Sequence, residues 1–119
     1  MGLTYTDIDI GADRALTHLV KVRFLIDSGA EYSVIPRVTL EELGVVPYRN
    51  IEIILADGSS LKREAGDVYF QFLGVKAPSP VIFGEPQDEP LLGAVTLENL
   101  GFMLDPLQRR IIKRKALRG

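Results

Sequence analysis

The stretch Phe24-Leu25-Ile26-Asp27-Ser28-Gly29-Ala30 (FLIDSGA) runs from three large apolar residues directly into a carboxylate. Residues 20–26 largely alternate apolar and polar side chains, which predicts a strand that ends at Asp27. Asp, Ser and Gly are favoured turn residues, so the tripeptide alone also fits an ordinary turn. The small residues after Asp27, however, allow another backbone to approach closely. An acid held at the edge of a core, where water is scarce, is a candidate catalytic group.

The rest of the chain predicts a mainly β protein with two short helices. Residues 39–43 and 94–100 are the expected helices. Thr39 and Glu42 match the T-x-x-E capping box, and Gly44 and Gly101 supply left-handed ends. A hairpin is expected at 56–59. The other expected strands cover residues 5–10, 34–36, 51–55, a stretch up to 73 as one strand or two, 81–83, 102–104 and 110–112.

A seven-residue segment occurs twice. Residues 38–44 (VTLEELG) and 95–101 (VTLENLG) match at six of seven positions. The match fits chance or shared capping chemistry, but it also fits two related halves packed about a pseudo-two-fold axis. Only the first half carries the acid.

Composition excludes several kinds of site. The 119 residues favour a single domain over 1–119, with a basic C-terminal tail at about 109–119. Without Cys there are no disulfides, thiol nucleophiles or cysteine zinc sites, and the single His18 argues against histidine metal sites and a Ser-His-Asp triad. We expect no metal and no cofactor. No signal peptide and no membrane span are expected, which favours a cytoplasmic protein without a membrane partner.

The basic tail raises the alternative of nucleic-acid binding. Six of the fourteen Lys and Arg residues lie in the last eleven positions, where there is no acid. A solvated end is the favoured interpretation, because no aromatic residue lies among the basic ones to stack on bases. We therefore expect no nucleic-acid partner.

Two motifs together resemble a known family. Asp27-Ser28-Gly29-Ala30 is similar to the D-[ST]-G-A signature of retropepsin-like aspartic proteases, the clan of retroviral proteases and their soluble prokaryotic relatives. Leu91-Leu92-Gly93 is similar to the second hallmark, two apolar residues and a glycine before the C-terminal helix. Residues 100–106 look like the helix stop and strand of cellular and prokaryotic members. The resemblance covers about residues 5–112 and implies a small closed β-barrel of the acid-protease type.

The resemblance implies an aspartic-type endopeptidase, a hydrolase that cleaves a peptide or protein substrate. One chain has one DSG motif, so an identical partner would supply the second carboxylate in a two-fold homodimer. Two Asp27 side chains about 3 Å apart cannot both ionise, so the pair would share one proton and activate a water. This chemistry needs no metal or covalent intermediate.

The resemblance also implies supporting roles. Ser28 corresponds to the hydroxyl residue that braces the two active-site loops across the dimer, and the carbonyl of Gly29 would lie near the substrate. The hairpin at 56–59 would be the flap that closes over bound peptide. The pockets are expected to be apolar, and the terminal strands to form an intersubunit sheet that buries Ile111 and Ile112. The expected substrate-binding residues are Ala30, Glu31, Ala56, Asp57, Gly58 and Leu91.

One position departs from the family pattern. Viral members have an arginine directly after the second-hallmark glycine, where it pairs with an acid near the catalytic motif. Glu31 could supply that acid, but Ala94 occupies the arginine position.

The alternative to a protease is a catalytically idle module of the same fold that binds peptides or partners.

Overall fold

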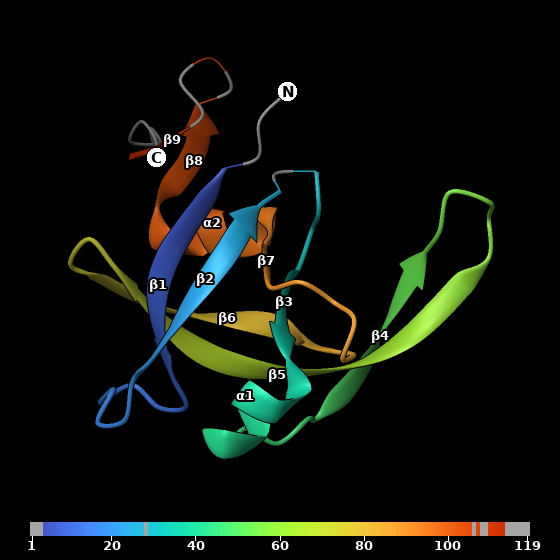
Figure 1. Cartoon of the computed structure of the whole chain (residues 1–119), viewed down its shortest axis with the longest axis horizontal. Helices are drawn as coiled ribbons and strands as arrows, with labels where there is room; N and C mark the ends of the chain where they lie inside the picture. The colour runs from blue at the N-terminus through green and yellow to red at the C-terminus, as the bar shows by residue number, and fades with distance from the viewer. Residues whose placement is uncertain (1–3, 28, 106, 108–109, 114–119) are drawn as a thin grey trace, which may run out of the picture.

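The computed structural model describes residues 4–27, 29–105, 107 and 110–113 (Figure 1). Its elements follow one another as β1 (Tyr5–Gly11), β2 (Val20–Ile26), β3 (Ser33–Pro36), α1 (Arg37–Glu42), β4 (Arg49–Ile54), β5 (Ser60–Phe72), β6 (Val75–Gly84), β7 (Leu91–Leu92), α2 (Ala94–Leu100), β8 (Phe102–Asp105) and β9 (Arg110–Lys113). The mainly β class with two short helices is confirmed.

Six strands close into a barrel, as predicted. The sheet runs β1-β2-β7-β3-β6-β5-β4, and a further pairing between β1 and β5 closes the ring and leaves β4 outside it. Residues 9–11 of β1 pair with residues 69–71 of β5, while residues 5–10 pair antiparallel with β2. β4 pairs with β5 alone, so the β4–β5 hairpin extends away from the barrel (Figure 1).

The barrel core follows from alternation along its strands. In β2, Val22, Phe24 and Ile26 are buried, whereas Lys21 and Arg23 are exposed and Leu25 is half-buried. Phe24 and Phe70 are fully buried, and their ring centroids lie 5.9 Å apart. The strand that ends at Asp27 is therefore fixed by one face of the core.

β6 is much longer than the sequence indicated. Only residues 81–83 were expected, but the strand spans Val75–Gly84. Pro78 and Pro80 obscured it, because proline lacks the N–H of a regular ladder. The two prolines are two positions apart, so their missing donors lie on the same side of the strand. Along residues 75–80, β6 pairs with β5 alone, and this leaves its other side free for them.

The helices confirm one expectation and correct another. Gly44 and Gly101 have φ of +79° and +82°, as left-handed ends require, and α2 has the predicted bounds. The capping box is wrong, because α1 begins at Arg37, Pro36 is its N-cap, and no side chain caps it. Both copies of the repeated segment bury their two leucines: Leu40, Leu43, Leu97 and Leu100. The pseudo-two-fold relation remains a prediction.

The C-terminal strands form a ribbon of their own. β8 and β9 pair antiparallel with each other, from Phe102↔Lys113 to Asp105↔Arg110. Leu104 and Ile111 pack against the barrel core, and Ile112 is half-buried. β1 pairs with β2 and β5 in the barrel and not with this ribbon. The intersubunit sheet expected from the terminal strands remains a prediction, because the structure contains one chain. The rest of the basic tail lies outside the described residues. No described helix is long and apolar enough to cross a membrane.

We predict that Gly101→Ala lowers the free energy of unfolding by about 1–2 kcal/mol, because alanine is strained at positive φ. Thr39→Ala is expected to change it by less than about 0.5 kcal/mol, because no capping hydrogen bond is lost. Urea unfolding followed by circular dichroism measures both. A larger loss in Thr39→Ala than in Gly101→Ala would contradict these helix boundaries.

Candidate active site

The Asp27 turn begins where β2 leaves the barrel. The Asp27 N–H donates to the carbonyl of Leu92 at 3.0 Å, and the Ala30 N–H donates to the Asp27 carbonyl at 3.1 Å. The carboxylate is oriented by the Gly29 N–H, which donates to Oδ1 at 3.0 Å. The Asp27 side chain is exposed in a single chain. The environment with little water that the sequence suggested for this carboxylate is therefore not formed by one chain alone. Ser28 lies outside the described residues.

β7 holds the turn from one side. It lies between β2 and β3, with Leu91 and Leu92 parallel to Leu25 and Ile26 of β2. On its other side, Leu91 pairs antiparallel with Val34 of β3. The second hallmark segment is therefore a strand of the barrel, hydrogen-bonded directly to the strand that carries Asp27.

The start of α2 holds the turn from the other side. The first N–H groups of a helix have no partner within it. Here Ala94 N–H donates to the Ala30 carbonyl at 2.8 Å, and Val95 N–H donates to the Glu31 carbonyl at 3.0 Å. Gly93 permits this approach, since a Cβ there would lie 2.6 Å from the carbonyl atoms of Tyr32. Ala94, at the position where the family pattern has an arginine, therefore contacts the turn through its backbone N–H.

The β4–β5 hairpin ends in the predicted turn. Leu55 N–H donates to the Ser59 carbonyl at 2.8 Å, and Gly58 has φ of +87°. The Asp57 carboxylate accepts the Ser59 hydroxyl at 2.5 Å and the Ser59 N–H at 2.9 Å. These bonds hold the pKa of the exposed Asp57 carboxyl below its ordinary value, the hydroxyl contributing most. Ala56, Asp57 and Gly58 are all exposed at the tip.

A groove of about 330 Å³ lies between this hairpin and the barrel. Its walls come from the hairpin, from the neighbouring barrel strands and from the loop before β7. The lining residues are Val34, Ile53, Leu55, Leu61, Arg63, Ile82, Asp88, Glu89 and Leu91. Leu91, one of the expected substrate-binding residues, is among the residues that line this groove. Ala30, Glu31 and the hairpin tip at 56–58 do not line this groove in the single chain.

The fold resembles several solved proteases. No family model and no curated protein matches the sequence. EIAV protease complexed with the inhibitor HBY-793 matches with a TM-score of 0.57 and 19% identity, covering 84% of this chain and 89% of the other. The retroviral protease-like domain of Ddi1 from Leishmania major gives 0.55 and 19%, covering 94% and 90%. A retropepsin-like aspartic protease from Rickettsia conorii gives 0.52 and 21%, covering 87% and 88%.

This chain has the retropepsin-like fold. At these identities the likeness establishes the architecture, and the chemistry has to be argued from the residues. Within the retropepsin-like fold, the Asp27 turn and the Leu91-Leu92-Gly93 segment are adjacent in space, although more than sixty residues separate them in the chain.

Sequence reasoning missed a buried hydroxyl cluster behind the turn. Ser33, Ser79 and Thr96 are at most 2% exposed. The Thr96 hydroxyl lies 2.5 Å from that of Ser33 and 2.8 Å from that of Ser79. Ser33 Oγ also accepts the Gly93 N–H at 2.9 Å. The cluster therefore ties β3, β6 and α2 together beside the glycine that the Asp27 turn depends on.

We predict that Ser33→Ala lowers the free energy of unfolding by about 1–3 kcal/mol, because the buried Gly93 N–H loses its acceptor. Ser60→Ala, which removes an exposed hydroxyl at the start of β5, is the matched control and is expected to stay within about 0.5 kcal/mol. Urea unfolding of both variants measures the difference. Equal effects would argue against a structural role for the cluster.

A second prediction concerns the hairpin tip. Because the pKa of Asp57 is lowered in the folded chain, its contribution to turn stability is present above the ordinary pKa and is lost as the pH falls through the folded value. Ser59→Ala removes the largest cause and is expected to raise the pKa of Asp57 toward its ordinary value. Carboxyl NMR titration measures this shift, and an unchanged pKa would refute the assigned cause.

Proposed function

We propose that the chain is an aspartic endopeptidase that acts as a homodimer, with one Asp27 from each copy. The observation that carries the proposal is the Asp27 turn itself. Its carboxylate is exposed at the end of a buried strand, is oriented by the Gly29 N–H and is anchored through Leu92. A retropepsin-like fold with one such turn per chain needs a second copy to supply a second carboxylate.

The proposed mechanism uses the two carboxylates as a unit. Two Asp27 groups about 3 Å apart cannot both be charged, so they share one proton and titrate as a pair. The ionised member takes a proton from a water molecule while the protonated member donates to the substrate carbonyl. The water oxygen attacks the carbonyl carbon, and the tetrahedral intermediate collapses as the amide nitrogen leaves with a proton.

The supporting residues are assigned in the same proposal. The Ser28 hydroxyl braces the two active-site loops across the dimer, and the Gly29 carbonyl lies near the substrate. Ala30 and Glu31 bind the substrate beside it. The hairpin tip, residues 56–58, closes over bound peptide and excludes water. Exposed apolar residues on the hairpin favour this assignment, because Ile54 and Leu55 are 65% and 40% exposed in the single chain.

We predict that Asp27→Asn abolishes cleavage of a denatured protein substrate, with a loss of at least about 1,000-fold in kcat/KM. The matched control is Asp13→Asn in the loop between β1 and β2, where the amide oxygen can still accept the Leu16 N–H. Chromatographic detection of peptide products between acidic and neutral pH measures the rates. Equal cleavage by the wild type and Asp27→Asn would end the proposal, and binding without cleavage would favour an idle binding module.

An active site shared between two chains also predicts the activity of mixtures of wild type and Asp27→Asn. If each site needs two Asp27 groups, an equal mixture of wild type and Asp27→Asn forms inactive mixed dimers. Activity per wild-type chain is then expected to fall to about half once subunits have exchanged. An unchanged activity per wild-type chain in a verified mixed dimer would show that one Asp27 is enough.

A further inference from the structure

The groove beside β7 is lined in part by charged residues, although the sequence predicted apolar pockets. Arg63, Asp88 and Glu89 line it together with six aliphatic residues. The loop that carries Asp88 and Glu89 leads directly into β7. Any residue that enters the groove beside Leu91 therefore also meets this loop.

The positive charge of Arg63 is already compensated. Its Nη1 lies 3.1 Å from Glu85 Oε1 and 3.7 Å from Asp88 Oδ2, and only 21% of its side chain is exposed. Asp88 Oδ2 also accepts the Glu85 N–H at 2.8 Å. These contacts form a braced network at the base of the loop, in which Arg63 and Asp88 are paired with each other.

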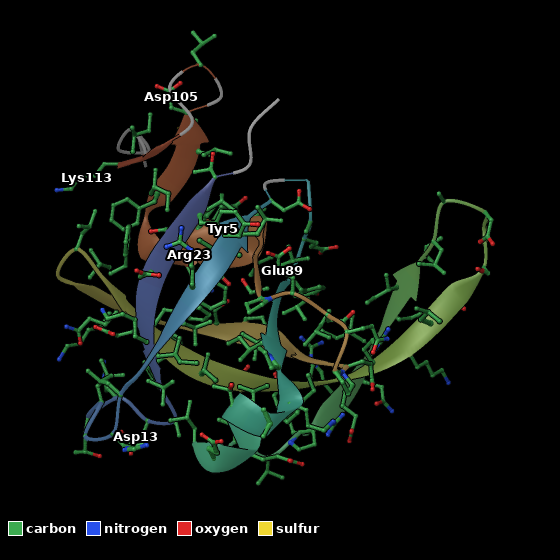
Figure 2. The ribbon with its side chains drawn as sticks, in the orientation of Figure 1. Tyr5, Asp13, Arg23, Glu89, Asp105 and Lys113 are labelled. Carbon is green, nitrogen blue, oxygen red and sulfur yellow. The ribbon has the colours of Figure 1, made fainter. Side chains whose placement is uncertain are left out.

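Glu89 is different. Its Oε1 accepts the Tyr5 hydroxyl at 2.9 Å, a contact with a neutral group, and no salt bridge among the described residues reaches its carboxylate. The Arg23 guanidinium lies over the face of the Tyr5 ring, 5.2 Å from its centroid (Figure 2). This contact helps to hold the ring in place. Tyr5 thereby positions the carboxylate and leaves Oε2 available as an acceptor.

We propose that this groove binds a lysine or arginine side chain of the substrate peptide, with its aliphatic stem on the apolar wall and its cationic group at Glu89. Lysine and arginine commonly lay their methylene stems along apolar surface while the charged group stays near water. Val34, Ile53 and Leu91 offer such a surface, and the exposed Glu89 offers the charge complement. The inference rests on the proposed protease function, whose substrate class it specifies.

The test is a comparison of peptides that differ at one position. Short fluorogenic peptides based on a sequence cleaved by the wild type carry Lys, Arg, norleucine or Glu at each position flanking the cleaved bond in turn. At one of these positions, Lys or Arg is expected to raise kcat/KM about two- to fivefold over norleucine, the range of an exposed ion pair. The advantage should shrink at high ionic strength.

Glu89→Gln keeps the Tyr5 hydrogen bond possible and removes the charge, so the ratio of kcat/KM between the basic and the norleucine peptide should fall to about one. The matched control is Glu98→Gln on the exposed face of α2, which loses the same charge outside the groove. An advantage that is absent, or that survives in Glu89→Gln, overturns the inference. Cleavage that still depends on Asp27 would in that case leave the protease proposal intact.

Binding provides a second measurement that does not require cleavage. Fluorescence anisotropy of the same labelled peptides with the wild type and with Asp27→Asn reports affinity directly. Tighter binding of the Lys or Arg peptide, if it is lost in Glu89→Gln, supports the inference even when no peptide is cut. The absence of cleavage would refute the protease proposal but not the inference about the groove. Equal affinities for the basic and norleucine peptides overturn the inference.

Discussion

The Asp27 turn is held by backbone hydrogen bonds on both sides, and the geometry of the site depends on them. The Asp27 N–H is bonded to Leu92 in β7, and the carbonyls of Ala30 and Glu31 accept the first N–H groups of α2. Both anchors meet at Gly93, where a Cβ would overlap the Tyr32 backbone. The hydroxyl cluster then fixes Gly93 from behind through Ser33. Among the described residues, these contacts join backbone groups to one another and to one neutral hydroxyl.

The two walls of the groove differ in how they are supported. The barrel wall, with Val34 and Leu91, rests on a closed sheet and a buried core. The hairpin wall pairs only within itself beyond the barrel, and it exposes apolar side chains such as Ile54. A site that closes over its substrate needs one rigid wall and one wall that can move, because the movable wall has to admit the substrate before it shields the reaction from water. The barrel wall fits the first role and the hairpin wall the second.

Sequence reasoning succeeded where the signal is local. The apolar run into Asp27 and the glycines at 44 and 101 predicted a strand end and two helix ends, because each depends on neighbouring residues. It failed for β6, where two prolines obscured the strand.

The hydroxyl cluster and the contact between Tyr5 and Glu89 could not be predicted from the sequence for another reason. Ser33 and Thr96, like Tyr5 and Glu89, are more than sixty positions apart, and only the folded chain brings them together. The central claim is that two Asp27 carboxylates meet across a dimer axis. A crystal structure of the assembled protein tests it most directly: the account predicts carboxylate oxygens about 3 Å apart. Asp27 side chains that are remote from each other and fully solvated in every assembly would contradict it.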